Sequence, residues 1–556
     1  MQLVSGAVAK SRLQSVERRL TSVRPAYVLV PLAALQIGIA FWFAFNTPHN
    51  GWVWYSGGDA TSYWTEAWAV GHWLMPAGAI GWALPLAYGW VPLIAGPSLL
   101  TGAQVIVLVQ GIVLVPLALL LFWLVANRLF GRVYAWACAV LWVIGPLLLL
   151  HGFVPSYHWV FDQLFLVPHW FGFTPMADFP SLVGVLATVW LTLRAVDDGS
   201  PTDAVLAGLA GGLTLALKPS NGFMVPALVV LVVGARRWRE GALWIAGVVP
   251  SLVALALWKQ RGLGTLPIKS ATPAVRTASS THPILALSTS KYLPLDPRHY
   301  VDELNGLREV FWSLRFVEFL AVAGAFGLIR KSPVRGLFVV VWFLSYGVVK
   351  ASSSGSNFQS ATFWRLAEPA LPAYLLLAVG VAYCVPAWGR RAAVAAVPSG
   401  GWRAIDWRVV APAAVVLGLV PILVIATLRA HGPYRYARDE NLVQEAPLSS
   451  AFHIHAVRIP GNKVRITWVK PPSTGGAVTT FLVMTSGDSD GCVPVQRGAS
   501  RCKLNDMTTL TETGNTTYVD SMEEYVHKWY RVALAASYNE FHGDLMLVSN
   551  AAEVSH

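Results

Sequence analysis

The chain has 556 residues, of which 55% are hydrophobic and only 13% charged, with 25 Trp and a formal net charge of +12. Soluble globular proteins carry about a quarter charged residues, so this composition argues against a soluble protein and predicts a polytopic membrane protein. Nucleic acid is not the expected partner of the positive charge, because most basic residues flank apolar segments, as they do in cytoplasmic loops.

Apolar segments long enough to cross a bilayer, about 20 residues each and fewer where helices are broken, recur along most of the chain. We predict eleven crossings, at residues 27–45, 105–126, 133–150, 182–193, 204–217, 223–233, 242–258, 316–329, 336–349, 371–384 and 409–428. The pattern predicts a cytoplasmic segment over residues 1–24, an α-helical membrane domain over 25–430 and a separate region over 431–556.

The distribution of basic residues predicts the orientation. Lys and Arg precede the first crossing and then fall in every second loop, whereas the loops around Asp59 and Asp178 contain neither. Basic loops face the cytoplasm, so the N-terminus is expected inside, and both acids and the C-terminal region outside. The N-terminus lacks a short apolar core followed by a small-residue cleavage site, so we expect the first segment to be a retained helix.

The region after residue 430 changes to short alternating segments separated by turn residues, which indicates β-structure. The stretches "KVRITWVKPPSTGGAVTTFLV" (463–483) and "KWYRVALAASYNEFHGDLMLVSN" (528–550) resemble the early and late strands of a fibronectin type III domain. The resemblance implies an all-β sandwich outside the membrane, where it could hold an acceptor, act as a spacer or bind an envelope protein.

The four cysteines fall into two groups. Cys138 and Cys384 lie inside apolar segments and are expected to be packing residues. Cys492 and Cys502 flank a short loop of the C-terminal region, and they lack metal-ligand spacing. Because the space outside the inner membrane is oxidising, we predict a disulfide between them.

The loop after the first crossing contains an acid among aromatic residues. An Asp there can be a solvated loop residue, and its Trp neighbours can be an interfacial belt. However, "GGDATSYWTEAWAVGHW", "WALPLAYGWVPLIAGP" and "LFWLVANRLFG" together resemble the first external loop and second helix of the GT-C superfamily of membrane glycosyltransferases. The resemblance implies a polyprenyl-phosphate sugar donor, Asp59 as catalytic general base, and Tyr63 one turn later. Glu66, two turns on, is a further candidate substrate contact.

Three more residues match this family pattern. Asp178, in "FTPMADFPSLVGVLATVWLTLRA", matches a second acidic residue facing the cavity, although an Asp two residues before Pro180 can equally be a helix cap. Lys218 follows a glycine-rich short helix in "AGLAGGLTLALKPSNGFMVPALVVLVV", and Arg365 opens "RLAEPALPAYLLLA". The resemblance implies that these two cations stabilise the leaving lipid phosphate, while snorkelling to lipid headgroups is the alternative.

The sequence leaves further substrate contacts, a metal ion, the acceptor and the exact donor open. His158 and His169 in the second external loop are candidate substrate contacts, and a divalent cation such as Mg²⁺ or Mn²⁺ is left open because no metal-ligand spacing occurs. Residues 259–315 are expected to form a lid. The acceptor can be a glycan, glycolipid or protein hydroxyl. An Ala-, Val- and Gly-rich composition is typical of GC-rich bacteria, which favours an actinobacterial decaprenyl-phosphate donor.

A different class of protein shares part of this pattern. Secondary transporters and lipid-linked sugar flippases also carry membrane-embedded charges and glycine-interrupted helices. Against that alternative, the acids here cluster at predicted external helix ends, and no repeat relates the two halves of the chain. The sequence therefore favours an inverting glycosyltransferase of the bacterial cell membrane.

Overall fold

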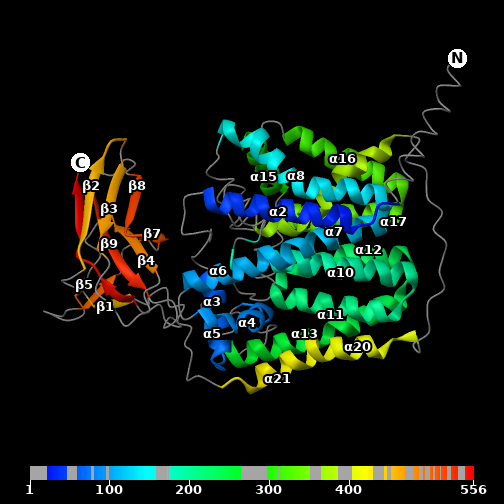
Figure 1. Ribbon diagram of the computed structural model, residues 1–556, viewed down its shortest axis with the longest axis horizontal. Helices are drawn as coiled ribbons and strands as arrows, with labels where there is room; N and C mark the ends of the chain where they lie inside the picture. The colour runs from blue at the N-terminus through cyan, green and yellow to red at the C-terminus, as the bar shows by residue number, and fades with distance from the viewer. Residues whose placement is uncertain are drawn as a thin grey trace, which may run out of the picture.

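The protein consists of a helical bundle and a smaller body of β-strands (Figure 1). The computed structural model describes residues 22–46, 59–76, 80–95, 99–157, 172, 174–263, 297–310, 314–350, 365–385, 404–429, 444–447, 452–461, 463–469, 480–486, 493–494, 501–504, 508–513, 515–521, 527–535 and 545–555. Of the predicted cytoplasmic segment 1–24, residues 1–21 lie outside this part of the chain.

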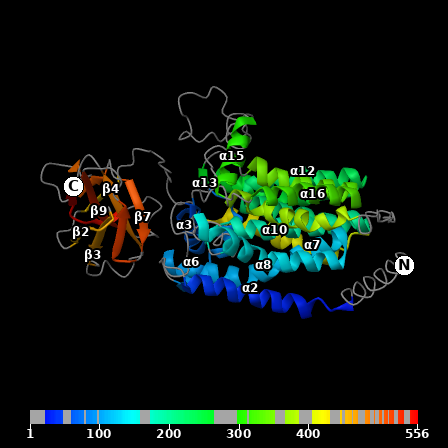
Figure 2. The ribbon, with the colours of Figure 1, turned by 90° about the horizontal axis from the view of Figure 1, so that it is seen from above.

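The bundle contains the following helices in chain order: α2 (Ala26–Asn46), α3 (Asp59–Gly71), α4 (Ala83–Tyr88), α5 (Val91–Ala95), α6 (Leu99–Val109), η1 (Gln110–Leu114), α7 (Val115–Phe130), α8 (Arg132–Tyr157), α10 (Asp178–Asp198), α11 (Pro201–Leu217), η2 (Pro219–Met224), α12 (Val225–Gly234), α13 (Trp238–Leu263), α15 (Pro297–Val310), α16 (Leu314–Lys331), α17 (Pro333–Phe343), η5 (Leu344–Lys350), η6 (Glu368–Ala370), α19 (Leu371–Gly380), η7 (Val381–Cys384), α20 (Trp407–Ala414), η9 (Val415–Leu419) and α21 (Val420–Thr427). The short helices α3, α4 and α5 gather at one end of the bundle (Figure 1). Helix α2 lies along its outside, against α7 and α8 (Figure 2).

All eleven predicted crossings overlap helices, but the number of crossings is not confirmed. Six helical stretches of the described chain are long and apolar enough to span a membrane: Gly102–Phe130, Asp178–Asp198, Trp238–Gly262, Pro333–Lys350, Arg365–Cys384 and Trp407–Thr427. Shorter apolar stretches also occur, among them the hairpin of α11 and α12, which is interrupted at Lys218. Lys218 adopts an extended conformation before Pro219, because the α conformation is disfavoured immediately before proline.

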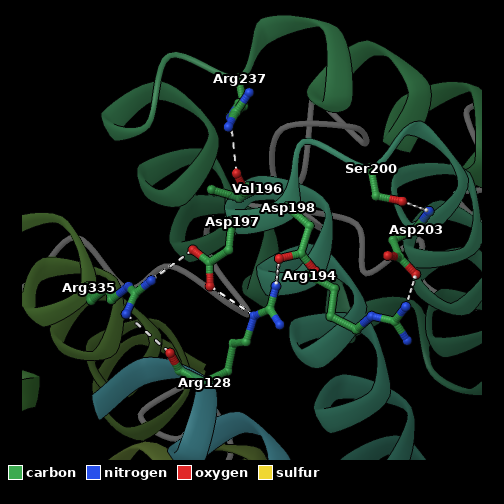
Figure 3. A network of polar contacts seen from close by, with 9 residues as sticks. All are labelled: Arg128, Arg194, Val196, Asp197, Asp198, Ser200, Asp203, Arg237 and Arg335. Atoms are coloured by element: carbon green, nitrogen blue, oxygen red, sulfur yellow. Dashed lines mark hydrogen bonds and ion pairs between the residues drawn. The ribbon is translucent and has the colours of Figure 1, made fainter. Parts of the chain in front are cut away.

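Arginine side chains join several helices at one end of the bundle, which we call the basic end (Figure 3). The carboxylate of Asp197 accepts from Arg128 at 3.0 Å and from Arg335 at 2.8 Å, which ties α10 to α7 and α17. Arg194 pairs with Asp203 at 3.1 Å at the start of α11. Nε of Arg237 donates to the carbonyl of Val196 at 3.0 Å, so residues from four separate stretches of basic sequence meet at this end, as the alternation of basic loops predicts.

Helix α10 sets the distance between the basic end and the opposite end of the bundle. It has 21 residues, from Asp178 to Asp198, and a rise of 1.5 Å per residue makes it about 30 Å long, close to the thickness of a hydrocarbon core. Asp178 therefore lies about one membrane thickness from the arginine network.

The described part of the C-terminal region consists of β-strands and the short connections between them, as predicted. Its strands are β1 (Gln444–Pro447), β2 (Ile454–Ile459), β3 (Lys463–Trp468), β4 (Thr480–Ser486), β5 (Val493–Pro494), β6 (Arg501–Leu504), β7 (Thr508–Thr513), β8 (Thr517–Ser521), β9 (His527–Ala535), β10 (Leu545–Val548) and β11 (Ala552–Ser555). One antiparallel sheet has the order β2-β3-β8, and another has the order β10-β9-β4-β7 with β11 also paired to β9.

Both sheets contribute to one hydrophobic core. Val464, Ile466 and Trp468 alternate with more exposed residues along β3, and they pack with Phe481 of β4 and Val532 of β9. The alternation places every second side chain of a strand on the core face, so the two sheets stack face to face as a sandwich.

The predicted disulfide stays a prediction. Cys502 lies in β6, but Cys492 lies outside the described residues. Within the described chain there is no disulfide, and Cys138 and Cys384 are free, with Cys138 fully buried.

Candidate functional site

Three of the predicted site residues meet at the end of the bundle opposite the arginine network. Nζ of Lys218 donates to Oδ1 of Asp178 at 2.5 Å, and Nε of Arg365 donates to Oδ2 at 3.2 Å. The Asp178 side chain is only 2% exposed, against 18% for Lys218 and 10% for Arg365. We call this arrangement the Asp178 clamp, and the end that carries it the clamp end.

Local sequence places each member of the clamp at a helix end. Asp178 is the first residue of α10, where a carboxylate interacts favourably with the positive end of the helix dipole. The N-cap residue of α10 is Ala177, so Asp178 lies in the first turn of the helix and is not itself the N-cap residue. Lys218 lies at the break between α11 and η2, and Arg365 begins the helix Arg365–Cys384.

Asn221 fixes the backbone around Lys218. Its backbone nitrogen donates to the carbonyl of Lys218 at 2.9 Å, and its side-chain Nδ2 donates to the carbonyl of Thr214 at 2.9 Å. The hydroxyl of Tyr346, in η5, donates to the carbonyl of Asn221 at 2.8 Å. These contacts are buried, so the position of Lys218 depends on a polar network between α11, η2 and η5.

Two further charged residues lie at the clamp end, and sequence reasoning missed both. Lys350 is the last residue of η5, and Glu368 follows Arg365 by three positions, which places the two side chains on one helix face. Lys350 is 1% exposed and Glu368 is 5% exposed. Both interact electrostatically with Asp178 and Lys218. Their positions beside the ends of apolar segments, away from the basic loops, were the available signal.

The helix that begins at Asp59 packs toward the clamp end. Tyr63 and Trp64 of α3 belong to one buried hydrophobic cluster with residues 176–177 and 216–217, the pairs that immediately precede Asp178 and Lys218. Asp59 is the first residue of α3, although its side chain lies outside the described part of the structure. The predicted base is therefore carried by an element that shares a core with the clamp.

Gly81 allows the first loop to approach the hairpin tip closely. A Cβ atom at this position would lie 1.9 Å from the carbonyl oxygen of Ala216 and 2.7 Å from that of Leu217. No other residue type fits this approach without backbone movement, so Gly81 helps to set the position of the first loop against Lys218.

Glu66 is a buried contact within α3 rather than a solvent-facing acid. It is 3% exposed, and its Oε1 accepts from the backbone nitrogen of Ile80 at 3.4 Å. Lys259 interacts electrostatically with Glu66 and donates to the carbonyl of Ile80 at 3.1 Å. Lys259 lies within α13, so the predicted lid over 259–315 begins with helix, and its residues 264–296 lie outside the described chain.

Some predicted site residues are not described. His158 and His169 lie outside the described residues, so their assignment as substrate contacts stays a prediction. Within the described part of the chain, no group of three or more His, Cys, Asp and Glu side chains could hold a metal ion.

The long apolar helices, with charged residues confined largely to their ends, define a multi-pass membrane protein. Residues 160–258 match the family model of the dolichyl-phosphate-mannose-protein mannosyltransferases. The chain is similar to that family over a segment that contains Asp178 and Lys218, and this similarity supports a membrane glycosyltransferase of the GT-C type. No curated protein and no solved structure matches the chain.

Proposed function

We propose that this protein transfers a sugar from a polyprenyl-phosphate donor to an acceptor hydroxyl at the clamp end of the membrane domain. The observation that carries the proposal is the meeting of Lys218 and Arg365 on the carboxylate of Asp178, in and beside the segment similar to mannosyltransferases. An anion with two oxygen atoms already bridges these cations, and a phosphate group offers the same two acceptors.

In this proposal, the cations act on the leaving group. Breaking the bond between the anomeric carbon and the phosphate oxygen leaves negative charge on the lipid phosphate, which Lys218 and Arg365 stabilise. Asp178 holds the two cations together in the resting protein. It could accept a proton from the acceptor only by giving up an ion pair, so it is a positioning residue and not the base.

Asp59 is the proposed general base. It begins α3, whose Tyr63 shares a core with the residues before Asp178 and Lys218. A carboxylate there would take the proton of the acceptor hydroxyl as the hydroxyl oxygen attacks the anomeric carbon from the face opposite the phosphate. General base catalysis contributes about 100-fold to 10,000-fold, and single displacement inverts the anomeric configuration.

The same proposal places the clamp end outside the cytoplasmic membrane of a bacterium and the basic end in the cytoplasm. The β-sandwich then lies outside the membrane as an accessory domain similar to fibronectin type III. Its sheet orders, β2-β3-β8 and β10-β9-β4-β7, support that similarity because they place early and late strands of the chain in both sheets. We favour decaprenyl phosphate as the lipid carrier of the donor sugar.

A panel of radiolabelled polyprenyl-phosphate sugars tests the function. The purified chain in nanodiscs, given the labelled donor and an acceptor extract, should form a product whose label is glycosidically linked and whose anomeric configuration is inverted. Movement of label between leaflets without a new glycosidic bond would support the flippase alternative and contradict the transferase.

A further inference from the structure

One residue of the first loop, Ile80, is hydrogen-bonded to two helices at once. Its backbone nitrogen donates to Oε1 of Glu66, in α3, at 3.4 Å. Its carbonyl oxygen accepts from Nε1 of Trp258 at 3.1 Å and from Nζ of Lys259 at 3.1 Å, and both of these residues lie in α13. The peptide groups of Ile80 therefore link α3 to α13. We call Ile80 and these three side chains the Ile80 node.

The Ile80 node is buried, and the residues that follow it are fixed as well. Glu66 is 3% exposed and Trp258 is fully buried. Nε1 of Trp82 donates to the carbonyl of Ser251, one helix region earlier in α13, at 3.3 Å. Buried hydrogen bonds are costly to break because no water replaces the lost partner. The loop at Ile80 therefore cannot move relative to α13 without a large loss of free energy.

Helix α13 is in turn packed tightly on α11, the helix that ends at Lys218. A Cβ atom at Gly208 of α11 would lie only 2.2 Å from the carbonyl oxygen of Trp244 of α13. Backbones in such direct contact move together, because packed interiors have little free volume. The Ile80 node thus fixes α3 against the pair of helices that carries the phosphate-binding Lys218.

The same helix α3 begins with the proposed base. Glu66 follows Asp59 by seven positions, which is two helical turns, or about 10 Å along the helix axis. Because a helix moves as a unit over this length, a shift of α3 at Glu66 also moves residue 59. A displacement of about 1 Å between reacting groups can cost about 100-fold in rate.

We propose that Glu66 is a positioning residue for the general base. By accepting the hydrogen bond of Ile80, it holds α3, and with it Asp59, at the distance from Lys218 that the transfer reaction needs, and Lys259 supports the same peptide from α13. This role replaces the substrate contact that the sequence predicts for Glu66. The inference rests on the proposed function, since it takes the base and the leaving phosphate from it.

Three variants of the full chain in nanodiscs test the role of the node. Glu66→Leu removes the acceptor for Ile80 and should lower kcat by about 10-fold to 100-fold, while the affinity for a labelled polyprenyl-phosphate sugar stays at the wild-type value. Glu66→Gln retains an oxygen that can accept from Ile80, so it should keep most of kcat. Lys259→Met should lower kcat less than Glu66→Leu does, because Trp258 still donates to the carbonyl of Ile80.

A double-mutant cycle with the base separates positioning from general structural damage. In Asp59→Asn there is no base to position, so adding Glu66→Leu should lower the residual kcat by less than about twofold, the range in which independent effects add. Damage to the fold would instead lower kcat by the same factor in both backgrounds. Glu240→Leu, which replaces an equally buried acid at the start of α13 near the basic end, is the matched control and should show that equal factor.

The cycle has clear contrary outcomes. An equal loss of kcat from Glu66→Leu with and without Asp59→Asn would overturn the inference. Weaker donor binding at unchanged kcat would also overturn it, because Glu66 would then act on the donor. Lys259→Met, taken through the same cycle, carries the test if Glu66→Leu does not fold. Normal turnover by Asp59→Asn alone would contradict the proposed base itself, and the inference with it.

Discussion

Asp178 and Arg365 are 187 positions apart in the chain, yet Nε of Arg365 lies 3.2 Å from Oδ2 of Asp178 inside the bundle. The contact joins the first residue of α10 to the first residue of the helix Arg365–Cys384. Because Asp178 is almost fully buried, removing one partner leaves part of a buried charge uncompensated, which can destabilise a protein. Variants of the clamp therefore need a folding control beside every activity measurement.

Removal of either clamp cation should weaken donor use. Loss of one charge-assisted hydrogen bond to the phosphate corresponds to about 1.5 to 3 kcal/mol, so Lys218→Ala and Arg365→Ala should each lower kcat/KM for the donor by roughly 10-fold to 100-fold. Initial rates at subsaturating donor measure the effect. Arg330→Ala, at the end of α16 remote from the clamp, is the matched control and should behave as wild type. Wild-type rates in both clamp variants, with normal size-exclusion profiles, would show that these cations do not act on the phosphate.

Substitution of the proposed base should lower turnover strongly and spare donor binding. Asp59→Asn retains the shape of the side chain but removes the proton acceptor, so kcat should fall by about 100-fold or more. Product formation from a labelled donor and separate donor-binding measurements distinguish these effects. Glu66→Gln on the same helix should lose much less, because Glu66 is a buried contact to Ile80. Normal turnover by Asp59→Asn would show that Asp59 is an ordinary solvated loop residue and not the general base.

A methyl group at the loop–hairpin contact should destabilise the membrane domain. In Gly81→Ala the new Cβ would lie 1.9 Å from the carbonyl oxygen of Ala216, and relieving such a clash in a packed interior costs about 1 to 3 kcal/mol. Thermal unfolding followed by Trp fluorescence in detergent should show a lower midpoint. Gly38→Ala, where nothing lies within 4 Å of the added atom, is the control and should not lower it. Equal midpoints for the two variants would mean that the first loop does not depend on this approach.

Thiol counting tests the predicted disulfide between Cys492 and Cys502. The chain has four cysteines, and Cys138 and Cys384 are free. Denatured protein should therefore react at two thiols before reduction and at four afterwards, as measured by mass after alkylation. Four reactive thiols without a reductant, in protein purified from an oxidising compartment, would exclude the bond.

Sequence by itself determined the membrane class, the apolar segments and the all-β tail, because hydrophobicity and periodicity are local properties of the chain. It also determined which loops carry basic charge, and two of those residues, Arg128 and Arg335, meet on Asp197 at one end of the bundle. The sequence also identified Asp178, Lys218 and Arg365, because each lies at a predicted helix end and matches a residue of a known family pattern.

Only the tertiary structure decided which charges meet. Nothing local in the sequence shows that Asp178 receives both cations, or that Lys350 and Glu368 lie buried at the same end of the bundle, because these contacts join segments far apart in the chain. Nor did the spacing of Glu66 reveal its buried contact with Ile80. Helix packing sets such juxtapositions, since burial forces charged groups at helix ends to find partners from whichever helices lie beside them.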